Sequence, residues 1–167
     1  HPRDGHALHP WLQEHEDFWS HEATLKDGRE RRMAIAAYYG LVSWLDHNVG
    51  RILTTLDVAG LTDKTRVIYA SDHGDNLGAR GLWGKSNLYR ESVDIPMIAA
   101  GPGFEHARCD TPVSLLDLSV TLLDCFGLDA AKVLPDATGQ SLHSIARRPS
   151  DADRFVSSEY HAVGSNS

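Results

Sequence analysis

Residues 67–76 read Val67-Ile68-Tyr69-Ala70-Ser71-Asp72-His73-Gly74-Asp75-Asn76, an apolar run that ends abruptly in polar and ionisable side chains. The run begins near Thr65 and is rich in β-branched and aromatic residues, which predicts a short, largely buried strand. Polar residues directly after such a strand lie at its carboxyl end, where open α/β sheets place their ligands. The stretch therefore predicts an α/β fold and a site at the end of this strand.

A long amphipathic helix is predicted upstream, from about Arg31 to Ala59. Its apolar residues recur at alternating steps of three and four, which places them on one face of a helix. This face comprises Ile35, Tyr38, Val42, Leu45, Val49, Ile52 and Leu56. Gly60 provides a natural end to the helix. A long helix followed by a buried strand is typical of an α/β unit.

Two further elements are predicted downstream of the polar cluster. Residues 95–100 favour a second strand, closed by the turn at residues 101–103, Gly-Pro-Gly. Ser114, followed three residues later by Asp117, predicts a capping box at the start of a helix that ends near Gly127.

The ends of the chain carry weaker patterns. Residues 1–29 are polar and aromatic without a sustained period, and we expect irregular structure with short helical turns. Residues 128–153 are expected to form a loop with a short helix near residues 141–146. Residues 154–160 are expected to form another strand.

The composition is that of an ordinary soluble globular domain, with 167 residues, 41% hydrophobic and 23% charged. The net charge of −7, with both signs interspersed, argues against nucleic-acid binding, which needs a concentrated basic surface. No apolar run approaches the roughly 20 residues needed to cross a bilayer, so we expect no membrane partner. Cys109 and Cys125 form no C-x-x-C pair, which is only weak support for the cytoplasm and leaves the localisation open.

The polar cluster contains candidate metal ligands. Asp72 supplies a hard anionic oxygen and His73 an imidazole nitrogen, and adjacent ligands at a strand end can share one divalent cation. Lys85 follows Gly84 and is placed to reach an anion that the metal binds. From the residues alone, the competing interpretation is a capping Asp72 beside a surface His73.

The same residues carry a family resemblance. Residues 67–78 and 81–85 resemble the distal metal-site motif of sulfatases in the alkaline phosphatase superfamily, most nearly the choline sulfatase and phosphonate monoester hydrolase branch. Flanking segments also resemble family blocks, so that the resemblance covers roughly residues 30–167. These segments are residues 38–51, Glu91 with residues 95–98, residues 111–124 and residues 158–161.

The resemblance implies a fold and roles for named residues. The implied fold is a central mixed β-sheet flanked by helices, an alkaline phosphatase-like sandwich. Asp72 and His73 match the family's C-terminal pair of metal ligands, and Lys85 matches the lysine that contacts the sulfate group and the nucleophile. Trp83 either walls the substrate pocket or packs in the interior. Glu159 and His161 either face the leaving group or lie at the surface.

The sequence departs from the family pattern at the nucleophile. Sulfatases use a cysteine in a C-x-P-S-R type motif that is oxidised to formylglycine, and neither Cys109 nor Cys125 has that context. The family's N-terminal pair of metal-binding aspartates also has no match. We therefore expect residues 30–167 to be a partial catalytic domain, truncated at both ends, that is inactive alone, exposes apolar surface and self-associates.

Three functions are compatible with these observations. The first is a portion of a sulfatase that hydrolyses small-molecule sulfate esters with a divalent cation, for which Ca²⁺ is the expected ion. The second is a phosphonate or phosphodiester hydrolase of the same superfamily that uses Mn²⁺ or a similar ion. The third is a non-catalytic module that binds metal or an anion. A homo-oligomer is compatible with each of them.

Overall fold

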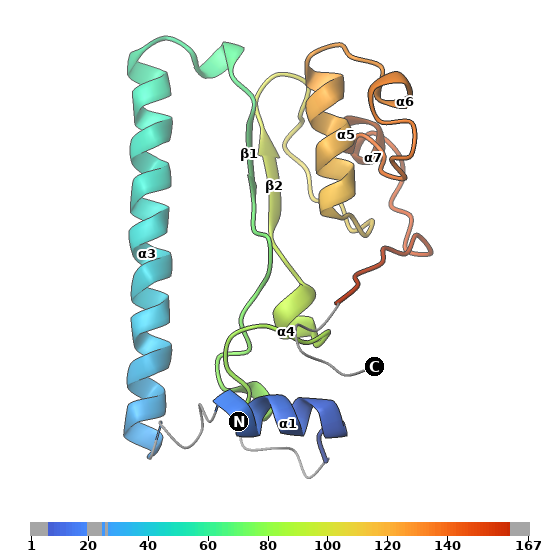
Figure 1. The fold of residues 1–167 in the computed structure, drawn as a ribbon. Helices are drawn as coiled ribbons and strands as arrows, with labels where there is room; N and C mark the ends of the chain where they lie inside the picture. Colours follow the sequence, from blue (N-terminus) through green and yellow to red (C-terminus); the bar gives the residue numbers. More distant parts are fainter. Residues whose placement is uncertain (1–6, 20–24, 26, 161–167) are drawn as a thin grey trace.

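The computed structural model describes residues 7–19, 25 and 27–160 (Figure 1). The helices are α1 (Pro10–Trp19), α3 (Gly28–Val58), α4 (Arg90–Val93), α5 (Leu115–Cys125), α6 (Ala130–Val133) and α7 (Leu142–Ala146), with 3₁₀ turns η1 (Thr62–Lys64) and η2 (Ala79–Gly81). The strands are β1 (Val67–Ala70) and β2 (Met97–Ala100). No helix in the described ranges is both long and apolar enough to span a bilayer.

The two predicted strands are confirmed and form one antiparallel pair. Val67 lies opposite Ala100, and Ala70 lies opposite Met97. The second strand begins at Met97 rather than residue 95, because Pro96 has no N–H to donate to the ladder. In Figure 1, α3 stands on one side of this pair and α5 on the other, so that the described residues form a helix–sheet–helix arrangement.

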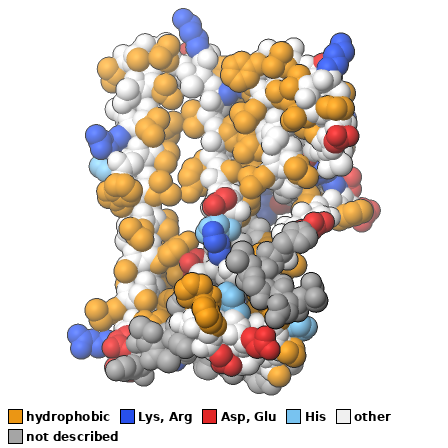
Figure 2. Space-filling view, in the orientation of Figure 1, with side chains coloured by type: hydrophobic (Ala, Val, Ile, Leu, Met, Phe, Trp, Pro, Cys, Tyr) orange, Lys and Arg blue, Asp and Glu red, His pale blue; other side chains and the backbone are white. Residues whose placement is uncertain are grey.

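The predicted long helix is confirmed as α3. Asp27 caps its start, because its Oδ1 accepts hydrogen bonds from the backbone N–H groups of Arg29 and Glu30 at 2.7 and 2.8 Å. No residue of α3 is buried, and hydrophobic side chains are exposed along its length (Figure 2). The exposed apolar surface that the sequence leads us to expect lies here.

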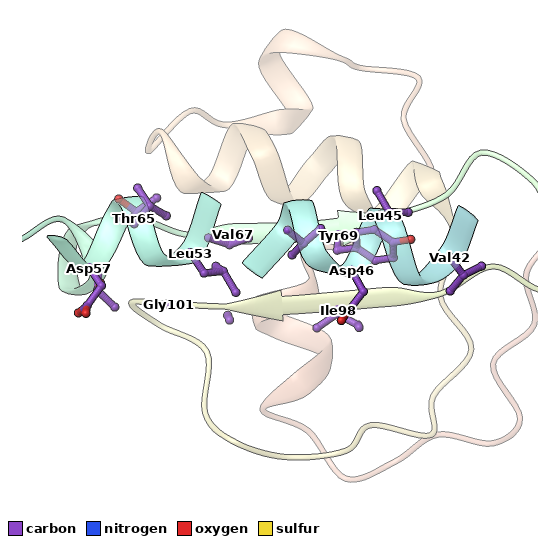
Figure 3. Close-up of a pocket in the computed structure, with 14 residues that line it drawn as sticks. Val42, Leu45, Asp46, Leu53, Asp57, Thr65, Val67, Tyr69, Ile98 and Gly101 are labelled. Carbon is purple, nitrogen blue, oxygen red and sulfur yellow. The ribbon is translucent and has the colours of Figure 1, made fainter. Parts of the chain in front are cut away.

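The apolar face of α3 looks across a groove toward the sheet (Figure 3). The groove has a volume of about 610 Å³. It is lined from the helix by Val42, Leu45, Val49, Leu53 and Leu56, and from the sheet by Val67, Tyr69, Ile98 and Ala100. The four sheet residues share one face because residues two apart in a strand point the same way. Three of the four buried hydrophobic residues among those described, Val120, Leu142 and Ile145, lie instead on α5 and α7, on the other side of the sheet.

A fully buried carboxylate organises this region. Asp117 closes the predicted capping box with Ser114, whose N–H donates to Asp117 Oδ2 at 2.7 Å. The second oxygen, Oδ1, accepts from the backbone N–H of Gln140 at 2.8 Å and from Arg154 Nη2 at 2.7 Å. Asp117 therefore caps the start of α5 and also holds two later segments of the chain, at Gln140 and at Arg154.

Three sequence expectations for the ends of the chain need correction. The strand expected at residues 154–160 is absent from these described residues, because Arg154 is held by Asp117 and the Pro112 carbonyl rather than by a strand ladder. Residues 1–29 include a regular helix, α1, which starts with Pro10 in the position that proline favours. The expected loop at residues 128–153 contains α6 as well as the predicted short helix, α7.

We predict that Asp117→Asn lowers the free energy of unfolding by about 3 kcal/mol or more, because it leaves the largely buried Arg154 guanidinium without its counter-charge. Asp110→Asn is the matched control. Its ion pair with Arg108 is mostly exposed, and its loss is expected to cost less than about 1 kcal/mol. Urea unfolding followed by circular dichroism measures both, and equal costs would contradict the central role of Asp117.

Candidate metal and anion site

The turn after β1 carries the predicted metal ligands. Asp72 Oδ1 accepts from the backbone N–H of His73 at 3.0 Å, and Ser71 Oγ donates to the His73 carbonyl at 2.8 Å. Gly74 N–H donates to the Ser92 carbonyl at 2.8 Å. A Cβ on Gly74 would lie 2.1 Å from the Glu91 carbonyl oxygen, so only glycine permits this approach. The turn is therefore held tightly against α4.

The side chains of Asp72 and His73 converge. His73 Nδ1 lies 2.8 Å from the Gly74 carbonyl, which can only accept, so Nδ1 carries a proton, and in the neutral imidazole Nε2 then presents the lone pair. Asp72 Oδ2 lies 3.6 Å from that Nε2. The Asp72 side chain is 80% exposed and that of His73 is 40% exposed. A carboxylate oxygen and an oriented imidazole nitrogen at this spacing fit two ligands of one divalent cation.

Lys85 joins this pair. Its Nζ lies 2.6 Å from His73 Nε2, although twelve residues separate the two in the sequence. Gly84, with φ of +68°, and Ser86, with φ of +83°, flank Lys85 in the left-handed region. The three residues that the sequence predicts for metal and anion binding are thus brought together.

Asp75 and Asn76 hold the Lys85 loop in place. The Gly84 carbonyl accepts from both the backbone N–H and the Nδ2 of Asn76, at 2.8 and 2.7 Å. Asp75 Oδ1 accepts from the N–H of Gly84 at 3.2 Å and from that of Leu77 at 2.8 Å. Asn76 is only 2% exposed, so these contacts are shielded from water. We call this set of contacts the Gly84 clamp.

Asp72, His73 and Lys85 line a cavity of about 480 Å³. Segments distant in sequence complete its wall, including Ser114 at the start of α5 and Glu159 near the C-terminus. Glu159 therefore faces the same cavity as the ligand pair, whereas His161 lies outside the described residues.

Trp83 is not among the residues that line this cavity. Its ring lies against Gly78, where an added Cβ would be 3.0 Å from a ring carbon, and this geometry agrees with the packing interpretation of Trp83.

The ligand set is small. Among the described residues, no group of three or more His, Cys, Asp or Glu side chains lies close enough to hold a metal ion. The sequence therefore predicts two ligands here, Asp72 and His73, whereas calcium takes six to eight oxygens in typical sites. The pair fits a divalent cation only as part of a larger set.

Comparison with known proteins identifies the family. The family model for sulfatases matches residues 4–128. The chain belongs to the sulfatase family. A choline-sulfatase from Rhizobium meliloti is 38% identical over 126 residues, which are 75% of this chain and 24% of that protein. We placed the resemblance at residues 30–167, whereas the family match begins at residue 4, which includes α1, and ends at residue 128.

Solved structures of sulfatase relatives share the fold. Phosphonate monoester hydrolase from Silicibacter pomeroyi superposes with a TM-score of 0.68 at 28% identity, over 75% of this chain and 24% of that one. A protein solved in complex with its substrate D-glucosamine-2-N,6-O-disulfate gives 0.69 at 25% identity, over 94% of this chain and 32% of that one. The predicted alkaline phosphatase-like α/β fold is confirmed, and the chain spans about a quarter of the length of the curated sulfatases it matches.

An ion pair that the sequence reasoning missed joins η2 to α4. We call it the Arg80–Glu91 brace. Arg80 Nη1 donates to Glu91 Oε2 at 2.7 Å, and the Arg80 guanidinium lies 4.3 Å from the centre of the Tyr89 ring. The Arg80 hydrogen bond, aided by a backbone hydrogen bond, lowers the pKa of Glu91 from its usual 4.5. The sequence analysis also gives no role to Asp75 and Asn76 of the Gly84 clamp. An aspartate followed by a glycine-rich stretch is a turn signal, and it could have indicated this loop.

We predict that Asn76→Ala loosens the Gly84 clamp and separates Lys85 from His73. Loss of a buried hydrogen bond is expected to lower the free energy of unfolding by about 1–2 kcal/mol. Asn48→Ala is the matched control, since Asn48 donates to the Trp44 carbonyl on the exposed surface of α3 and its loss should cost under about 0.5 kcal/mol. Nuclear Overhauser contacts between Lys85 and His73 that survive in Asn76→Ala would contradict the role of the clamp.

We also predict that the Arg80–Glu91 brace weakens in acid. Because the folded-state pKa of Glu91 is lowered, its contribution to stability is present above the unfolded-state pKa and is lost as pH falls through the folded value. Stability is therefore expected to decline below about pH 4.5, and Glu91→Gln should flatten that decline. Urea midpoints at a series of pH values measure both proteins. Identical pH profiles would show that the brace contributes nothing.

Proposed function

We propose that this chain is the metal-and-anion-binding portion of a sulfatase that hydrolyses small-molecule sulfate esters. The observation that carries the proposal is the convergence of Asp72 Oδ2, His73 Nε2 and Lys85 Nζ at one cavity. Membership of the sulfatase family supports a sulfuric ester hydrolase. The alcohol of the ester stays unassigned.

The proposed division of labour follows from the chemistry of each side chain. Asp72 and His73 would hold one divalent cation, and calcium is the proposed ion, to which Asp72 would offer a hard oxygen ligand. When bound, the cation would supply Lewis-acid stabilisation of negative charge on the sulfate oxygens. Lys85 supplies a second positive charge from the protein, placed at the same cavity. Glu159 is proposed to face the alcohol part of the ester from the opposite end of the sequence.

The remaining catalytic groups are proposed to come from residues outside this chain's sequence. The proposed nucleophile is a formylglycine, and no cysteine here has the context that its formation requires. Two ligands are also too few for a calcium site, as the absence of a third candidate within the described residues indicates. We therefore propose that these 167 residues alone bind a metal weakly and do not turn over substrate.

A second candidate keeps the site and changes the ester. The likeness to phosphonate monoester hydrolase from Silicibacter pomeroyi supports a phosphonate ester as the substrate. For this alternative, which also includes a phosphodiester substrate, we propose Mn²⁺ or a similar ion. Assays of the complete gene product with paired aryl sulfate and aryl phosphonate esters separate the two. Faster turnover of the phosphonate ester would replace the sulfate proposal.

Metal titration of this chain tests the shared part of both candidates. We expect Ca²⁺ and Mn²⁺ to bind weakly in calorimetry, and the Asp72→Asn, His73→Ala variant to weaken that binding by at least about tenfold. The matched control is Asp136→Asn with His106→Ala, which changes the same residue types at exposed positions away from the cavity. Equal loss in both double variants would mean that the binding is non-specific and would overturn the proposed ligands.

A further inference from the structure

Asn87 is a buried polar residue in the wall of the cavity that Lys85 lines. It is only 7% exposed, and it lines this cavity together with Lys85, Asp72 and His73. Ser86 separates Asn87 from Lys85 in the sequence, and its φ of +83° lies in the left-handed region, which residues other than glycine rarely adopt. The chain thus presents Lys85 and Asn87 to one cavity from either side of a strained residue.

The Asn87 side chain uses only one end of its carboxamide within the described part of the chain. Its Oδ1 accepts from the backbone N–H of Tyr89 at 3.0 Å. An N–H group can only donate, so this contact fixes which end of the amide is oxygen and turns the NH₂ group away from Tyr89. Among residues 7–19, 25 and 27–160, this NH₂ group has no hydrogen-bond acceptor.

The unused N–H groups of Asn87 are open to the cavity. Asn87 Nδ2 is not one of the fully enclosed polar atoms that lack a partner in the described ranges, so it keeps some accessible surface. Because the rest of Asn87 is buried and the residue lines the cavity, that surface faces the cavity. Buried polar groups in proteins are nearly always hydrogen-bonded, so a donor that the protein leaves unused here is available to a bound acceptor.

We infer that Asn87 is a further substrate-binding residue, whose Nδ2 donates a hydrogen bond to an oxygen of the tetrahedral anion beside Lys85. The inference rests on the proposed function, in which Lys85 faces the sulfate group at this cavity. Lys85 supplies charge from a flexible stem, whereas the planar amide of Asn87, oriented by Tyr89, supplies a donor of fixed direction. A neutral donor also adds no positive charge next to the lysine.

The test titrates inorganic sulfate into this chain and follows the Asn87 side-chain N–H and Lys85 ε-methylene signals by nuclear magnetic resonance. The pH is fixed, and NaCl keeps the ionic strength constant, so that general screening does not change. Asn87→Ser removes the NH₂ group and keeps an oxygen that can accept from the Tyr89 N–H. Asn48→Ser is the matched control, because Asn48 lies on α3 and does not line the cavity.

We expect the Asn87 N–H signals of the unaltered chain to shift and saturate at the same sulfate concentration as the Lys85 signals. The half-saturating concentration should rise about tenfold or more in Asn87→Ser, since the lost hydrogen bond has a charged acceptor, and should not change in Asn48→Ser. A Lys85–His73 nuclear Overhauser contact that persists in Asn87→Ser separates loss of the donor from displacement of the loop.

Two results would overturn the inference, and they differ in what they leave standing. Saturation at Lys85 with stationary Asn87 signals, or with equal half-saturation in Asn87→Ser, would remove Asn87 from the site and leave Lys85 as the anion-binding residue. Absence of a saturable shift at both residues would overturn the role of Asn87 and the anion-binding part of the proposed function together. The Asn87 signals of the unaltered chain decide the question even if Asn87→Ser does not fold.

Discussion

The double hydrogen bond from Asn76 to the Gly84 carbonyl is the constraint on which the site depends. The backbone N–H and the Nδ2 of the buried Asn76 both donate to the Gly84 carbonyl oxygen. Asp75 Oδ1 accepts from the N–H of the same glycine. Lys85 follows directly, so its position relative to His73 is set by these contacts rather than by strand pairing. The long side chain of Lys85 thereby has a fixed backbone anchor beside the predicted ligands Asp72 and His73.

Around this clamp, some parts of the structure are closely packed and others are exposed. The turn after β1 is packed so closely on α4 that Gly74 has no room for a side chain, and Asp117 ties the C-terminal segments to α5. In contrast, α3 buries none of its residues and faces the sheet across an apolar groove. A closely packed turn after β1 therefore coexists with a helix whose hydrophobic face is exposed, and exposed apolar faces of this kind are typical of surfaces that meet another polypeptide.

The elements that sequence could predict are those with a strong local signal. These signals are the apolar period of α3, the change from apolar to polar residues at the end of β1, and the Ser114–Asp117 capping box. Each of them reflects interactions within a few residues. The Asp72–His73 pair was predictable because the end of a buried strand places polar residues together.

The errors and omissions involve contacts between distant residues. The expected strand at residues 154–160 fails because Arg154 is held by Asp117, which is 37 residues away. The contact between Lys85 and His73 depends on a clamp that no periodicity reveals. The role of Asn76 is visible only once the loop is seen to close on Gly84.

The central claim is that Asp72 and His73 are two ligands of one divalent cation. The most direct measurement is anomalous diffraction at the manganese edge from crystals of this chain soaked in Mn²⁺. The account predicts an anomalous peak within bonding distance of both Asp72 Oδ2 and His73 Nε2. A peak at other carboxylates only would contradict it.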